Sequence, residues 1–132
     1  MLRPTALALC LLLPTTALAA SLKDFELTRM LEKVAKESSV GTPRAINEDI
    51  LDQGYTVDGN ELINHLSVRS SHARQMRAHP DAVRTQLLGS VCSNRGFRQL
   101  LAKGAVLRYQ FSEYQSNRPV TSERYSAADC NL

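Results

Sequence analysis

The chain has 132 residues, a formal net charge of +3 at pH 7, 43% hydrophobic residues and 22% charged residues. This length is typical of one domain that builds a single core without extra cross-links. The charge is close to balanced, so it gives no indication of a nucleic-acid or membrane-surface partner. The sequence holds neither internal repeats nor a low-complexity stretch.

Residues 1–20 have the pattern of a secretory signal peptide. Arg3 precedes a short apolar run at residues 6–13, and Ala17 and Ala19 place small side chains at the two positions that a signal peptidase reads. Cleavage is therefore expected after Ala19 or the next residue. The mature protein is then exported and folds outside the cytosol, in the periplasm or in the extracellular medium.

After cleavage, residues 21–132 are expected to form one domain without a membrane anchor. The apolar run is much shorter than the roughly 20 residues that span a bilayer. Cys10 lies inside that run and follows Leu9, whereas a lipid-attachment cysteine needs a small residue before it. The leader therefore reads as a segment that is removed rather than one that holds the protein in a membrane.

The mature chain opens with a predicted helix over residues 23–38, where apolar side chains recur at helical spacing. Ser21 is the expected cap, and Asp24 and Glu26 then fall in the first turn, where the helix dipole favours anions. Gly41 and the proline that follows two residues later end the helix, because the residue before a proline disfavours helical backbone.

A β-hairpin is predicted over residues 50–69. Two runs of alternating polar and apolar residues flank Asp58-Gly59, a dipeptide that favours a tight hairpin turn. Alternation in the second strand predicts a core-facing side made of Leu62, Leu66 and Val68. Ile63 and His65 are expected to point to the opposite face.

The stretch after the hairpin predicts two to three short helices. Pro80 breaks a helix interior but is tolerated in a first turn, so a break is expected near His79, with a second helix at about residues 80–91. A third helix is expected to begin at Ser93 and to end at Gly104, a residue suited to the left-handed stop.

Two further strands close the chain. Residues 105–112 alternate strictly between apolar and polar side chains, and residues 120–126 can return beside them as an edge strand. Because isolated two-stranded hairpins are marginal in water, the two pairs are expected to merge. The predicted fold class is α+β, a four-stranded antiparallel sheet packed against helices.

The mature chain keeps two cysteines, Cys92 and Cys130. In an oxidising compartment an even pair without metal-ligand spacing is interpreted as a disulfide. Neither belongs to a Cys-x-x-Cys motif that would lower a thiol pKa, so a redox-active role is not indicated.

Charge is distributed unevenly along the mature chain. Residues 21–61 carry nine acidic and five basic side chains, whereas residues 62–132 carry ten basic and four acidic ones, nine of the ten being arginine. Arginine favours bidentate contacts with carboxylates and phosphates. One interpretation is that the two halves pair their charges on folding. The other is a face that receives a protein or an anionic envelope component, formed by Arg74, Arg77, Arg84, Arg95 and Arg98.

An acidic cluster precedes the predicted hairpin and raises the possibility of acid and base chemistry. It comprises Glu48, Asp49 and Asp52. Two carboxylates can act as general acid and base, but the cluster lacks the spacing of a calcium loop. A solvated entrance to the strand explains it as well.

Three histidines do not predict a metal site. They are His65, His72 and His79. The last two are seven residues apart, which separates them by roughly 10.5 Å along a helix, too far for one ion unless the chain bends. We expect neither a metal nor a cofactor.

The sequence also lacks the motifs of nucleophilic catalysis and of nucleic-acid binding. Neither a Gly-x-Ser-x-Gly motif, a papain-like cysteine context nor a glycine-rich phosphate loop is found. Arg108 lies beside Tyr109 and Phe111, but alternation turns the aromatic pair to the opposite face. The sequence therefore predicts neither an enzyme nor a nucleic-acid-binding protein.

Several segments resemble a family of small secreted Pseudomonas proteins called "putative quorum-sensing-regulated virulence factors". The resemblance covers nearly all of the mature chain. It is carried by residues 42–52, Gly54-Tyr55-Thr56-Val57, Val91-Cys92-Ser93, residues 97–101, residues 104–109 and Ala128-Asp129-Cys130. The family has no established biochemical activity, so the resemblance implies secretion, one α+β domain and an association with virulence, but no catalytic residue.

The leading hypothesis is therefore an exported, non-enzymatic interaction protein. Two alternatives stay open. One is a small envelope-acting hydrolase that uses the acidic cluster, and the other is a carrier of a small ligand, which needs an apolar cavity.

Overall fold

The computed structural model describes the backbone of residues 15–132 and the side chains of residues 21–132. The charged and apolar parts of the predicted signal peptide, with Arg3 and Cys10, lie outside the described residues. Within the described part of the chain, no helix is both long enough and apolar enough to cross a membrane.

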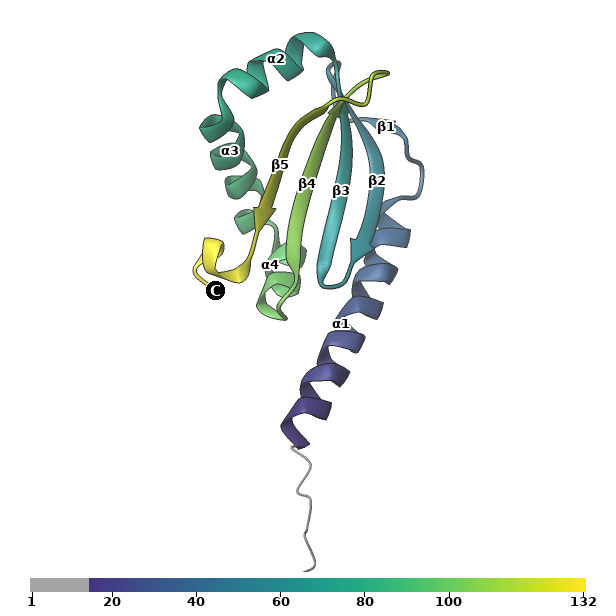
Figure 1. Cartoon of the computed structure of the whole chain (residues 1–132), viewed down its shortest axis with the longest axis vertical. Coiled ribbons are helices and arrows are strands. Elements are labelled where there is room, and N and C mark those ends of the chain that lie inside the picture. The colour runs from purple at the N-terminus through teal and green to yellow at the C-terminus, as the bar shows by residue number, and fades with distance from the viewer. Residues whose placement is uncertain (1–14) are drawn as a thin grey trace, which may run out of the picture.

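Residues 15–132 form a five-stranded mixed sheet with helices packed on one face (Figure 1). The strands lie in the order β1-β2-β3-β4-β5, each beside its neighbour in sequence. In chain order the elements are α1 (Thr15–Ser38), β1 (Arg44–Ala45), β2 (Ile50–Asp58), β3 (Glu61–Val68), α2 (Ser70–Ala78), α3 (Pro80–Ser93), α4 (Arg95–Ala102), β4 (Val106–Glu113), β5 (Pro119–Tyr125) and the 3-10 helix η1 (Ala127–Cys130).

The predicted α+β class is correct, but the predicted all-antiparallel, four-stranded sheet is wrong. β3 and β4 pair in parallel, from Glu61 beside Val106 to Val68 beside Glu113. The reason is the connection: α2, α3 and α4 carry the chain from the end of β3 back to the end where β3 began, so β4 starts there and runs the same way. Because β4, and not β5, lies beside β3, the two hairpins join through a parallel pair.

The fifth strand, β1, is two residues long and escaped the sequence analysis. Arg44 lies beside Asp52 and Ala45 beside Leu51, so β1 covers only one end of β2. The Asn47 side chain closes the loop between β1 and β2. It accepts hydrogen bonds from the backbone N–H of Asp49, the residue before β2, and from that of Ile50, the first residue of β2. Two residues carry too little pattern to be recognised as a strand.

The predicted hairpin of β2 and β3 is present, with two refinements. Its turn consists of Gly59 and Asn60 rather than Asp58-Gly59, with φ +60° at Gly59 and Asp58 paired with Glu61. A bulge interrupts β2 at Gly54, whose φ of +100° is a conformation that favours glycine. The bulge turns side chains of β2 without ending the strand.

The helices follow the predicted breaks closely, except at two starting points. Pro80 is the first residue of α3, as expected from its tolerance at a helix start. α4 begins after Asn94, whose side chain accepts a hydrogen bond from the Phe97 N–H at 3.0 Å, so the cap is Asn94 and not Ser93. α1 begins at Thr15, so Ser21 lies inside the helix of the full chain and is not its cap.

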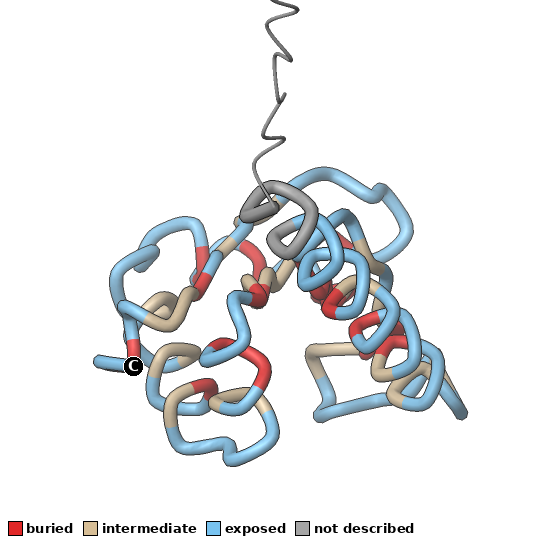
Figure 2. The backbone as a smooth tube through the Cα atoms, turned by 90° about the horizontal axis from the view of Figure 1, so that it is seen from below, coloured by how far each residue is buried: buried red, intermediate tan, exposed pale blue. Residues whose placement is uncertain are grey.

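The core lies between the sheet and the helices. A larger cluster joins α1, α3, α4 and η1 to the sheet, and a smaller one packs α2 against β3 and β4. Buried positions recur along one side of α1, as Figure 2 shows in red. Ile63 was expected on the open face, and the register agrees, yet it is only 4% exposed because Thr56 and Arg108 lie beside it on neighbouring strands.

Candidate interaction surfaces

Three of the five arginines of the predicted anionic-partner surface, Arg77, Arg84 and Arg98, make contacts within the protein. Arg77 Nη1 donates to Glu113 Oε1 at 2.7 Å, and its Nη2 donates to the Pro119 carbonyl oxygen at 2.8 Å. These contacts tie α2 to the turn between β4 and β5. The Arg77 hydrogen bond, with a second from Ser116, lowers the pKa of Glu113.

Arg84 holds α3 against the C-terminal edge of the sheet. Its guanidinium pairs with Glu123 at 3.3 Å and with Asp129 at 3.4 Å, and it stacks 4.8 Å from the ring centre of Tyr125. The Tyr125 hydroxyl donates to the Arg84 carbonyl oxygen at 2.8 Å. Burial, with a smaller contribution from Glu123, raises the pKa of Tyr125 to about 12. The tyrosine therefore remains a hydrogen-bond donor across the ordinary pH range.

Of the remaining arginines, Arg98 is bonded within the protein, and Arg74 and Arg95 are exposed. Arg98 Nη1 donates to the Cys92 carbonyl oxygen at 3.0 Å, which fastens α4 to the end of α3. Arg74 on α2 and Arg95 on α4 are exposed and form no ion pair within residues 21–132. The five arginines thus come from three helices, and only Arg74 and Arg95 keep a free guanidinium among the described residues.

Cys92 and Cys130 form a disulfide, as the cysteine count predicts. Cys92 lies in the last turn of α3 and Cys130 ends η1, where it is 8% exposed and belongs to the larger core cluster. The Asp129 carboxylate accepts from the Ser126 N–H at 2.8 Å and caps this short helix. The disulfide therefore anchors the C-terminus to the helical layer.

The acidic cluster at the start of β2 does not form one carboxylate site. Asp52 is buried, and its Oδ1 accepts hydrogen bonds from the Gly54 N–H at 2.8 Å and from Asn64 at 3.0 Å. Asp52 thereby stabilises the bulge of β2. Glu48 and Asp49 lie outside the core, along a hollow of about 330 Å³ between the β1–β2 loop and β3.

The three histidines are dispersed. His65 lies on the open face of β3, where its Nε2 is 2.6 Å from the Thr56 hydroxyl oxygen. Burial, and then the charge of Arg108, lower the pKa of His65. His72 lies 3.9 Å from Asp49, and His79 separates α2 from α3. Among residues 21–132, no three histidine, cysteine or acidic side chains are grouped to hold a metal ion.

The open face of the sheet carries an ion-pair cluster that spans the two halves of the chain. Glu61 on β3 lies 2.6 Å from Arg124 on β5 and 3.6 Å from Arg108 on β4. Tyr109 and Phe111 pack instead against the hydrophobic clusters on the other face, as predicted. Arg108 therefore has a structural partner and no aromatic neighbours beside it on its own face.

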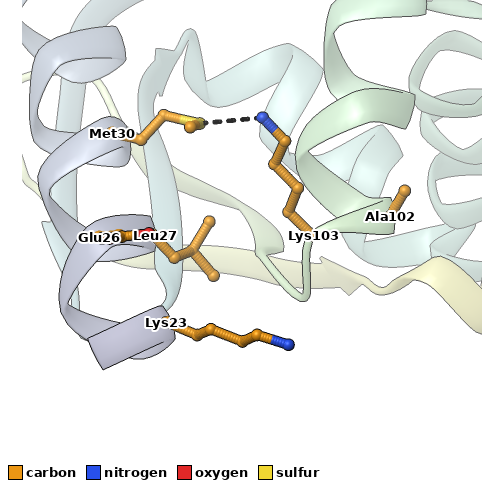
Figure 3. A pocket seen from close by; sticks show the side chains of 6 residues that line it. All are labelled: Lys23, Glu26, Leu27, Met30, Ala102 and Lys103. Atoms are coloured by element: carbon orange, nitrogen blue, oxygen red, sulfur yellow. Dashed lines mark hydrogen bonds between the residues drawn. The ribbon is translucent and has the colours of Figure 1, made fainter. Parts of the chain in front are cut away.

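A largely apolar groove lies between α1 and α4 (Figure 3). One part, of about 400 Å³, is lined from α1 by Lys23, Glu26, Leu27 and Met30 and from the end of α4 by Ala102 and Lys103. A second part, of about 320 Å³, shares Met30 and Lys103 with the first and extends to Val34, Asn94, Gly96, Phe97, Gln99 and Leu100. Because the two parts share these residues, we treat them together as the α1–α4 groove.

The charges at this groove are not compensated within the protein. The Lys103 ammonium lies 3.7 Å from the Met30 sulfur, as the dashed line in Figure 3 marks, and a thioether is a weak acceptor. Lys23 also lines the groove, and neither lysine forms an ion pair within residues 21–132. Glu26 contributes the one acidic side chain among the lining residues. The groove thus combines apolar lining residues with a net positive charge in its first part.

Sequence analysis did not identify this groove. Met30 and Val34 belong to the apolar residues that recur at helical spacing in the first helix, yet Met30 is 36% exposed because it lines the groove instead of the core. Lys103 carried no motif. Met30 on one wall and Lys103 on the other are 73 residues apart in the sequence, so their proximity is a result of the tertiary fold.

Together these features define a small, disulfide-linked α+β protein whose helical layer carries an apolar groove. The chain belongs to the family described as "Putative quorum-sensing-regulated virulence factor", whose family model matches residues 20–131. The resemblance noted in the sequence is therefore confirmed.

Solved structures share the fold. A crystal structure described as a "putative secreted protein" from Pseudomonas aeruginosa is 73% identical, with a TM-score of 0.81 over 83% of this chain and 96% of that one. The pilotin EpsS from the Vibrio vulnificus type 2 secretion system is 15% identical, with a TM-score of 0.66 over 83% and 96% of the two chains. The type II secretion system pilotin AspS from Vibrio cholerae is 14% identical, with a TM-score of 0.63 over 85% and 99%. No curated protein matches the sequence significantly.

Proposed function

We propose that this chain is an exported, non-enzymatic protein that binds a protein partner through the α1–α4 groove. The observation that carries the proposal is the groove itself, an apolar hollow of the size that ligands and partners use, with two unpaired lysines beside it. Solvent-exposed apolar surface between two helices is costly unless something covers it. A partner that covers Met30 and Val34 removes that cost.

Three observations support export and a binding role rather than catalysis. The leader has the pattern of a signal peptide, and the Pseudomonas structure with 73% identity is described as a "putative secreted protein". Asp52 is occupied with the bulge of β2, so the acidic cluster offers no assembled pair for the hydrolase alternative. The two Vibrio structures with this fold are described as pilotins of secretion systems, a role among other proteins. Periplasm and medium are both compatible with this proposal.

A photo-crosslinking amino acid tests the proposal in the native host. It is placed at Gln99, which lines the groove, or at Ser122, which is exposed on β5 and alternates to the open face of the sheet. The expected result is a discrete adduct with one protein from Gln99 and none from Ser122. The Gln99 adduct should disappear when Met30→Trp fills the hollow that both parts of the groove share.

Leu22→Trp is the matched control, because Leu22 is an exposed apolar residue on α1 that does not line the groove. It should leave the Gln99 adduct intact. The same adducts from Gln99 and Ser122, or an adduct that survives Met30→Trp in a folded protein, would overturn the assignment of the groove.

A further inference from the structure

The two walls of the α1–α4 groove restrict what its occupant can be. Both walls are helices, whose backbone N–H and C=O groups bond within the helix except at its ends. An extended peptide in the groove would bury its own backbone groups without a sheet edge to pair with, which is unfavourable. A helix arrives with its backbone hydrogen bonds already made, so it loses none on docking.

The length of the groove fits a short helix. Its lining residues on α1 run from Lys23 to Val34, which is about 16 Å at 1.5 Å per residue. A partner helix of about three turns covers that distance. Its apolar stripe would face Leu27, Met30 and Leu100, while its polar side remains in water.

Charge gives the partner a direction. Lys23 lines the first part of the groove, Lys103 lies where the two parts meet, and their ammonium groups form no ion pair among the described side chains. In the rest of the second part, the polar lining residues Asn94 and Gln99 are uncharged, and the Asn94 side chain already caps α4. Docking removes water from the two lysines, so the bound partner is favoured when it supplies a carboxylate there. Glu26 is the one acid among the lining residues, so the first part of the groove keeps a net positive charge.

We infer that the α1–α4 groove binds an amphipathic helix of about three turns in a protein partner, with the acidic half of that helix seated along the first part of the groove, against Lys23 and Lys103. This inference rests on the proposed function and specifies the partner's chemistry. It commits to a helix rather than an extended peptide, an acyl chain or a second copy of this protein.

Selection from a random twelve-residue peptide display library, against the exported protein as purified, tests the inference. The expected binders have apolar residues at i, i+3, i+4 and i+7 and Asp or Glu at one end, and they lose binding to the Met30→Trp variant but not to Leu22→Trp. In the protein, Lys103→Glu should weaken the binding of a synthetic version of a selected peptide about threefold to tenfold. Lys33→Glu, the same change on an exposed α1 residue outside the groove, should leave it unchanged. Replacing the peptide's acid by lysine should restore binding to Lys103→Glu.

The outcomes separate the inference from the proposed function. Some selected peptides could be blocked by Met30→Trp yet lack helical spacing, contain proline at their centre or show no acidic preference. Such binders would overturn the inferred helix or its direction, and they would leave protein binding in the groove intact. Binders that are indifferent to Met30→Trp, or none at all, overturn the groove as a protein site and the inference with it. Displacement of a selected peptide by a fatty acid, or self-association that Met30→Trp abolishes, would identify the acyl chain or the second copy as the occupant instead.

Discussion

Loss of the Cys92–Cys130 disulfide is expected to destabilise the fold by several kcal/mol. The two cysteines are separated by 38 residues, and closing a loop of that length lowers the entropy of the unfolded chain by an amount equivalent to about 4 kcal/mol at 25 °C. The effect acts on the unfolded state. It is therefore expected even though the Arg84–Asp129 pair and the cap at Ser126 hold η1 in place when the protein is folded.

Urea unfolding of the oxidised protein, the reduced protein and a Cys92→Ala, Cys130→Ala double variant measures this effect. Reduction should lower the free energy of unfolding by about 4 kcal/mol and the Tm by roughly 15 °C. The slope of free energy against urea should increase, because the unfolded chain without its cross-link exposes more surface. The double variant should lose somewhat more, since Cys130 is buried and alanine leaves a small cavity.

A loss below about 1 kcal/mol on reduction would refute the reasoning. It would mean that the unfolded chain is already compact around η1 and α3, or that the folded disulfide is opposed by strain. Unchanged urea slope together with a large loss would instead place the effect in the folded state.

Three further predictions concern the core, the bulge and an ion pair. Leu31→Ala, at a position with 0% exposure, should lower the free energy of unfolding by about 3 kcal/mol in chemical denaturation. Gly54→Ala should lower the free energy of unfolding by about 1–3 kcal/mol in the same assay, because φ is +100° there and the added Cβ would lie 3.0 Å from two side-chain oxygens. Gly41→Ala is the control, also at positive φ but with open space around it, and it should lower the free energy of unfolding by less. Arg77 lowers the folded-state pKa of Glu113, so their pair stabilises the protein at pH values above the unfolded pKa of 4.5, and this stability is lost as the pH falls through the lower folded pKa. Glu113→Gln should therefore flatten the acid side of a plot of unfolding free energy against pH. An unaltered plot would count against the pair.

Local patterns in the sequence were sufficient for most of the secondary structure. The alternation around Asp58-Gly59 located β2 and β3, and Pro80 located the boundary between α2 and α3, because each feature acts on its immediate neighbours. The disulfide followed from counting cysteines in an exported chain. These predictions needed no knowledge of how distant segments pack.

The sheet topology could not be obtained in the same way. Whether β4 pairs with β3 in parallel or antiparallel depends on the end of the sheet to which the three intervening helices return the chain. No periodicity within β4 indicates that direction. The same limit explains the groove. Lys103 has no local signal of function, and only the tertiary fold places it across from Met30.

The uneven charge of the two halves becomes interpretable once the ion pairs are known. Glu61 joins the acidic first half to Arg108 and Arg124 of the basic second half, which is the charge pairing that the sequence allowed. Arg77 and Arg84 instead use acids of the second half itself. Arginine suits these roles because its planar fork reaches two acceptors at once.

Lysine is used differently in this half of the chain. Lys103 is the one lysine of residues 62–132, and it is placed at the groove without a carboxylate. An ammonium is a compact and strongly hydrated charge that stays in water until a partner replaces that water. The arginines with acidic partners thus hold the fold together, whereas a lysine that the fold leaves without a carboxylate is available to a partner. This is why reversing the charge at Lys103 should change binding with little effect on stability, and removing the guanidinium of Arg84 should do the opposite.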